Sequence, residues 1–169
     1  MKRQEIRLKN IISLEDFFRR VAEELRKRIG FKRFHFLVAD DRNGNFSTKL
    51  STDGNSHIRL TEKELELLGG NIREDIFYPQ TVRRYSSFLE RILLFKFNWK
   101  IRRYGITAIM PIYSEDKIIC LILFTDRLSA NRLNGHSHYL TGINQEIAQC
   151  LEAILLYNQA LERINRKII

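Results

Sequence analysis

Two neighbouring apolar runs, Ile106–Tyr113 and Lys117–Phe124, constrain the fold of this chain more than any other stretch. A short polar break, Ser114–Asp116, separates them, and each run has the length of one strand, so together they predict a β-hairpin. Neither run alternates with polar residues, so both faces of each strand need cover. This predicts a central pair in an antiparallel sheet of about five or six strands, with helices or loops above and below.

Amphipathic helices are predicted near both ends of the sequence. Apolar residues recur every three or four positions in Leu14–Ile29, with Ser13 as the N-cap and Gly30 as the stop. A longer helix is predicted from about His136 onward, with apolar residues spaced alternately by four and three. This line continues beyond Tyr157, where the flanking positions turn polar, and therefore predicts a partner helix. The residues expected in a homodimer contact are Ile154, Tyr157, Leu161, Ile164 and Ile168.

Shorter elements are predicted between the helices. Thr61 and Glu64 have the spacing of a capping box for a short helix, Glu62–Leu68. Further along, Tyr85–Lys96 is predicted to be helical, and Asn98–Gly105 is expected to be extended. The expected strands before these helices are Phe31–Asp40, Phe46–Ser51 and His57–Leu60.

Positive charge is concentrated in one segment. The chain has a formal net charge of +9, and Ile72–Tyr104 contains eight basic residues against three acidic ones. Alternation along an extended segment would put Trp99 and Arg103 on one side, where an arginine can bind an anion beside a stacking ring. The competing interpretation is that these cations lie on solvated helix faces. The residues predicted to bind a ligand are Arg103, Trp99, Thr107, Tyr104, Arg84 and Tyr85.

The sequence favours a non-enzymatic cytoplasmic domain. It has no Walker loop, no HExxH motif and no paired cysteines at metal-binding spacing. His136 and His138 are expected at the surface of a helix start. Cys120 and Cys150 lie in apolar surroundings and are expected to be reduced and buried. No cofactor, metal or membrane insertion is expected, and nucleic-acid binding through the basic surface is an unfavoured alternative.

The order of elements and several local motifs resemble a bacterial GAF sensory domain. Tyr104–Ile112 is similar to the family's strand ending in an apolar-proline-apolar step, and Asp116–Leu123 to its next strand, although Cys120 replaces the usual glycine. Leu151–Tyr157 resembles the family's closing helix. The resemblance implies an α+β fold with both terminal helices on one sheet face and a variable cover on the other. The resemblance covers roughly Ile11 to Arg163. It implies a single sensory domain at 1–165, with 157–169 as the end of the C-terminal helix leading towards an output domain.

The resemblance also implies a function. GAF domains of this kind sense small molecules and precede diguanylate cyclase, histidine kinase or phosphatase domains. The implied ligand is a small anion, with a cyclic nucleotide such as cyclic AMP first, held under the Ile72–Tyr104 cover. Asp126-Arg127 departs from the Asn-Lys pair of cyclic-nucleotide-binding relatives. The alternative is a module that dimerises and transmits a signal without a ligand.

Overall fold

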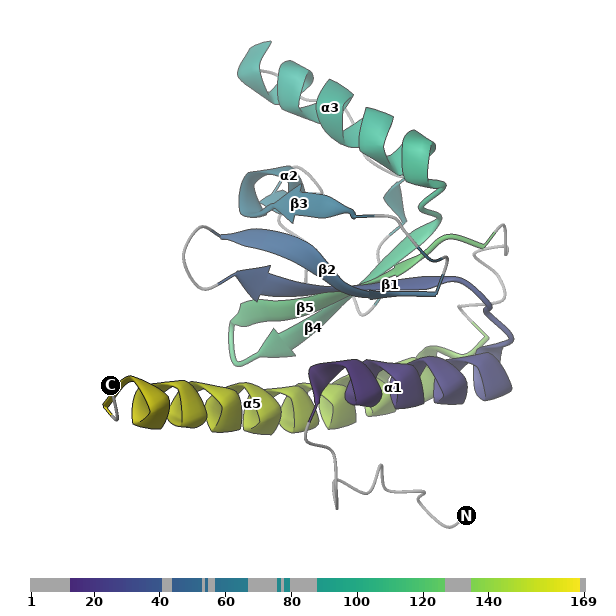
Figure 1. The fold of residues 1–169 in the computed structure, drawn as a ribbon. Coiled ribbons are helices and arrows are strands. Elements are labelled where there is room, and N and C mark those ends of the chain that lie inside the picture. The colour runs from purple at the N-terminus through teal and green to yellow at the C-terminus, as the bar shows by residue number, and fades with distance from the viewer. Residues whose placement is uncertain are drawn as a thin grey trace.

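The computed structural model describes residues 13–40, 44–52, 54, 57–66, 76, 78–79, 88–126 and 135–167. Within these ranges an antiparallel sheet of five strands lies between helices on its two faces (Figure 1). The elements are α1 (Leu14–Ile29), β1 (Phe34–Asp40), β2 (Asn45–Ser51), β3 (Arg59–Thr61), α2 (Glu62–Glu66), α3 (Phe88–Tyr104), β4 (Ala108–Ser114), β5 (Lys117–Phe124) and α5 (Ser137–Lys167). The predicted α+β class is confirmed.

Helix α1 begins and ends where its sequence predicts. The Ser13 hydroxyl oxygen accepts a hydrogen bond from the Asp16 backbone N–H at 3.0 Å, which satisfies one free donor of the first turn. Gly30 has a φ of 78°, the left-handed conformation that ends many helices. The apolar face between these caps is buried against the sheet, with Phe18 stacked on Phe36 of β1 at 4.7 Å between ring centroids.

The sheet has the strand order β3-β2-β1-β5-β4, so β1 is its central strand. The prediction that the hairpin of β4 and β5 forms the central pair is wrong, since β4 lies at an edge of the described sheet. Burial on both faces misled that prediction, because helices and loops can cover an edge strand as completely as an inner one. Pro111 fits the edge position, since it has no N–H to offer a further strand. Its carbonyl accepts a hydrogen bond from the Asn144 side chain of α5 at 2.8 Å.

Two apolar clusters cover the two sheet faces. The first joins α1 and α5 to alternate residues of β1, β4 and β5, including Phe36, Met110 and Ile122. The second joins Phe97 and Ile101 of α3 to the opposite side of the same strands. The predicted separation of the terminal helices from α3 is therefore confirmed (Figure 1).

One part of the predicted cover departs from that arrangement. Ile76 and Tyr78 pack against the first cluster, so the segment Ile72–Tyr104 does not lie wholly on the face that α3 covers.

Helix α3 replaces the extended segment predicted for Asn98–Gly105, and that prediction is wrong. Phe97 and Ile101 are one turn apart and both face the core, so the helix continues past the predicted end at Lys96. The helix ends at Gly105, which has a φ of 63°. The Ile106 N–H donates to the Ile101 carbonyl at 2.9 Å and the Gly105 N–H to Arg102 at 3.3 Å, the bonding pattern of a Schellman motif.

Candidate functional site

Trp99 and Arg103 lie one helical turn apart on α3 and contact each other. The guanidinium carbon of Arg103 is 4.8 Å from the centroid of the Trp99 ring and 5.9 Å from that of the Tyr104 ring. Arg103 and Trp99 are close together, as predicted. They are close because they are four residues apart in a helix, whereas the prediction placed them on one side of an extended segment. Both side chains are exposed, whereas Phe97 and Ile101 face the sheet. A ligand held by this pair would lie on the outer side of α3, not between α3 and the sheet.

The other predicted ligand residues have different positions. The Thr107 hydroxyl donates to the backbone carbonyls of Phe124 at 3.0 Å and Asp126 at 2.8 Å, so it is engaged by the protein itself. Arg84 and Tyr85 lie outside the described residues. Ligand binding by this set stays a prediction.

Lys100 has a structural role in the basic segment. Its ammonium nitrogen lies 2.7 Å from one oxygen of Glu64 and donates to the other oxygen and to the Arg59 carbonyl, both at 2.9 Å. Glu64 also accepts from the Thr61 N–H at 2.9 Å, and its own N–H donates to the Thr61 hydroxyl at 3.1 Å. This confirms the predicted capping box and shows that one buried carboxylate ties α2, β3 and α3 together.

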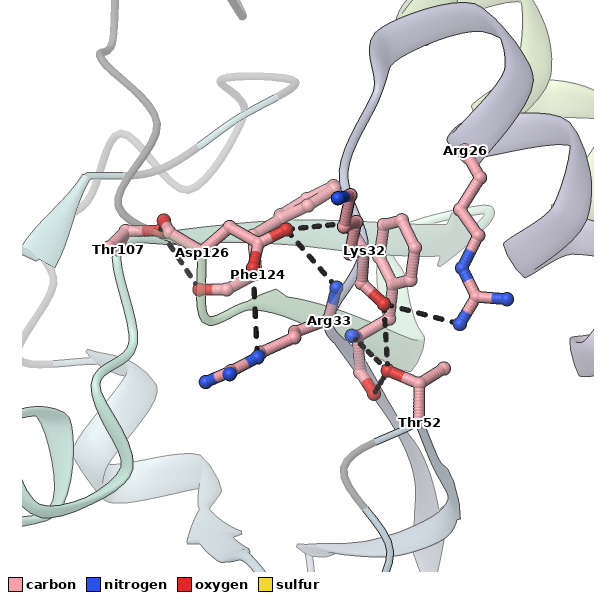
Figure 2. Close-up of polar contacts among 8 residues, drawn as sticks. Arg26, Lys32, Arg33, Thr52, Thr107, Phe124 and Asp126 are labelled. Atoms are coloured by element: carbon pink, nitrogen blue, oxygen red, sulfur yellow. Dashed lines mark hydrogen bonds and ion pairs between the residues drawn. The ribbon is translucent and has the colours of Figure 1, made fainter.

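Asp126 joins the connection between α1 and β1 to the end of β5 (Figure 2). Its carboxylate accepts hydrogen bonds from the backbone N–H groups of Lys32 and Arg33, and the Arg33 Nε lies 4.0 Å from the other carboxylate oxygen. The Arg26 guanidinium donates to the Lys32 carbonyl at 3.2 Å. Asp126 therefore holds the connection between α1 and β1 against the end of β5.

The space between α3 and the sheet is filled by apolar side chains in the described part of the chain. Leu37, Ile109, Leu121 and Leu123 of the strands are buried there together with Phe97. Among the described residues, a ligand at this interface would therefore contact apolar side chains. The cations of α3 lie on the outer surface of the helix, except for Lys100, which pairs with Glu64.

The cysteines are buried and free, as predicted. Burial raises the pKa of the Cys120 thiol, and burial together with the charge of Glu146 raises the pKa of Cys150. Both thiols therefore stay protonated near neutral pH, which disfavours nucleophilic chemistry at either sulfur. His138 is exposed at the start of α5, and within the described ranges no group of histidine, cysteine and acidic residues could hold a metal ion. None of the described helices is both long enough and apolar enough to cross a membrane.

Helix α5 carries one apolar line with two different environments. Ile143, Ile147 and Cys150 pack on the sheet, whereas Tyr157 and Leu161 are exposed. Ile154 is 5% exposed and Ile164 is 54% exposed. Ile154 was predicted in the dimer contact, and this is wrong, because the side chain is already buried against its own sheet. Ile168 lies outside the described residues.

Comparisons with known proteins concern the fold. The GAF domain of a two-component sensor histidine kinase from Bacillus halodurans is 14% identical, and the alignment covers 88% of this chain and 99% of that one with a TM-score of 0.56. The A. aeolicus Nlh2 GAF domain in an inactive state is 11% identical over 86% of this chain and 89% of its own, with a TM-score of 0.54.

A third similar structure comes from a methyl-accepting chemotaxis protein. It is 19% identical over 89% of this chain and 96% of its own, with a TM-score of 0.53. No family model matches the sequence, and no curated protein matches it at a significant level. The shared strands and covering helices nevertheless leave one conclusion: this chain has the GAF fold.

Proposed function

We propose that the chain is a regulatory signalling domain that pairs through α5 with a second copy and passes its state along that helix to an output domain. One observation carries the proposal: the apolar line of α5 is buried as far as Ile154 and exposed at Tyr157, Leu161 and Ile164. The exposed residues continue the alternating four-and-three spacing of a coiled coil. Apolar side chains that stay in line beyond the body of the domain favour a helical partner.

A second copy of the chain supplies a matching line by symmetry. Fully burying an exposed leucine or isoleucine side chain contributes about 1.5–3 kcal/mol, and Leu161 and Ile164, which are already partly covered, would each contribute less than that. Coiled coils this short are marginal alone, so the domain surface has to contribute to the pairing. A parallel arrangement would direct two output domains the same way, for example two histidine kinase or diguanylate cyclase domains. The GAF fold, found in a sensor histidine kinase, supports this regulatory role.

Leu161→Glu is expected to convert the dimer to a monomer, because two charged side chains would face each other in the apolar line. Sedimentation velocity measures this directly. Leu156→Glu is the matched control: the substitution is the same and Leu156 is exposed, but it falls on the other side of α5. If both variants sediment as the parent chain does, the α5 line is not an oligomer contact.

The second candidate function is binding of a small planar anion, a cyclic nucleotide such as cyclic AMP first. The observation that favours it is the contact of Arg103 with the rings of Trp99 and Tyr104. A guanidinium can bind a phosphate while the neighbouring indole stacks on a base. In this proposal the anion binds on the outer side of α3, and its binding changes how α3 packs on the sheet.

Arg103→Ala is expected to weaken cyclic AMP binding roughly tenfold to more than a hundredfold, because a charged hydrogen bond contributes about 1.5–3 kcal/mol. Titration calorimetry with cyclic AMP, cyclic GMP and a linear nucleotide measures it. Arg102→Ala is the control, as a neighbouring exposed arginine of the same helix. If none of the three nucleotides binds near micromolar concentration, this candidate is abandoned and pairing through α5 remains.

A further inference from the structure

The outer face of α3 carries large apolar side chains that no described element covers. Phe95 is 74% exposed and Leu89 is 71% exposed, while Ile92 and Trp99 are also exposed. We call these four residues the α3 ridge. Helix α3 lies on the far side of the sheet from α1 and α5 (Figure 1), and the ridge is on the side of α3 away from the described strands. Phe97, completely buried, marks the opposite face of the same helix.

Basic residues border the centre of the ridge on both sides. At about 100° per residue, Arg91 and Arg102 fall on one side of Phe95 and Trp99, and Lys96 and Arg103 fall on the other. All four cations are exposed. The sequence of α3 contains five basic residues and one acidic residue. An exposed apolar strip between two rows of cations is the pattern of helices that lie in a membrane interface.

We infer that α3 docks the domain onto an anionic membrane surface, lying along it. The apolar ridge would enter the boundary between headgroups and acyl chains. The flanking lysine and arginine side chains would reach lipid phosphates, because long basic side chains keep their charge in the headgroup layer while their stems stay apolar. Trp99 suits the same layer, where tryptophan is enriched. The helix of 17 residues offers about 25 Å of contact along its axis.

Charge and shape favour this occupant over two others. Symmetric pairing of two α3 ridges would bring the same cations of both copies together, and like charges at an interface disfavour it. Nucleic acid would use the cations and could stack on Trp99, but the aliphatic Leu89 and Ile92 offer nothing to phosphates or bases. A lipid surface uses both the apolar and the basic residues.

Cosedimentation of the full chain with lipid vesicles tests the inference. The protein is expected to bind vesicles of equal parts phosphatidylcholine and phosphatidylglycerol, and to bind phosphatidylcholine alone much more weakly. Arg91→Gln/Lys96→Gln is expected to lower binding about 25-fold, since each basic residue near an anionic surface contributes about fivefold. Phe95→Ser is expected to lower it roughly tenfold or more through lost apolar contact. None of these three residues belongs to the predicted nucleotide site.

Two control variants match these changes elsewhere on the surface. Leu156→Ser removes an exposed apolar side chain from α5, and Arg20→Gln/Lys27→Gln removes two exposed cations from α1. Both should bind vesicles nearly as the parent chain does, and circular dichroism checks that every variant folds.

Three outcomes would overturn the inference. The first is equal binding to neutral and anionic vesicles, or no binding to either. The second is an equal loss in the α3 variants and their controls. The third is tight, salt-sensitive binding of a single-stranded oligonucleotide by a chain that ignores vesicles, which would make α3 a nucleic-acid surface.

Discussion

Phe124→Ala is expected to lower the free energy of unfolding by about 3–5 kcal/mol, the range for removing a phenylalanine from a well-packed core. Phe124 ends β5 and is completely buried. Its ring lies 4.7 Å from that of Phe31 and 5.6 Å from that of Phe34, measured between centroids. Phe124 is far along the sequence from Phe31 and Phe34, so the cavity left by alanine would loosen the contact of β5 with β1 and with the residues just before β1.

Urea denaturation followed by circular dichroism measures the loss. Phe95→Ala removes the same atoms from a side chain that is exposed on α3, and its effect should stay below about 0.5 kcal/mol. Similar losses in the two variants would mean that the aromatic cluster does not hold the sheet together as described.

Glu64→Ala is expected to lower the free energy of unfolding by about 2–4 kcal/mol. The carboxylate is nearly completely buried and bonds to the Thr61 backbone and to Lys100, so alanine would leave a partly buried ammonium and a free N–H without their partner. The value lies below that of a fully buried pair, because Lys100 is partly exposed and can reach water.

Glu66→Ala is the control for Glu64, since it removes an exposed carboxylate from the same short helix. Thermal unfolding at neutral pH compares the two. An equal midpoint for Glu64→Ala and Glu66→Ala would show that the link between α2 and α3 contributes little to stability.

Local signals predicted the terminal helices well. Helix α1 has a capping serine, a terminal glycine and an uninterrupted apolar face, and the structure confirms Leu14–Ile29 as its bounds. Helix α5 was predicted from spacing alone, and that spacing does not depend on what covers it. The apolar spacing is the same where the helix packs on its own sheet and where it could pack on a partner. For this reason the sequence did not show that Ile154 is still covered by the domain itself.

Two errors came from patterns with more than one structural solution. The apolar hairpin predicted burial on both faces and was placed at the centre of the sheet, although Pro111 in one of its strands already favoured an edge. The basic and aromatic end of α3 was predicted as extended. Apolar residues occur there on both sides of the chain, a pattern that suits a strand covered on both faces and also a helix with one buried and one exposed apolar face. In the structure Phe97 and Ile101, one helical turn apart, both pack on the sheet, and this contact favours the helix.

The candidate site was predictable only in part. Arg103 and Trp99 do lie together, since a spacing of four residues brings them together in a helix. The partners of Lys100 and Asp126 could not be predicted, because each bond joins residues far apart in the sequence. Those bonds form only when the folded elements come together, so no local sequence pattern predicts them.

Pairing of two copies through α5 is tested most directly by disulfide trapping. Ile164→Cys places a thiol in the exposed apolar line, where a parallel pair would bring the two new sulfurs within bonding reach. The native cysteines are buried and should not react. Mild oxidation is expected to give a covalent dimer with Ile164→Cys and little or none with Leu156→Cys, whose position falls outside the apolar line. Equal trapping at the two positions, or none at residue 164, would contradict the proposed pairing.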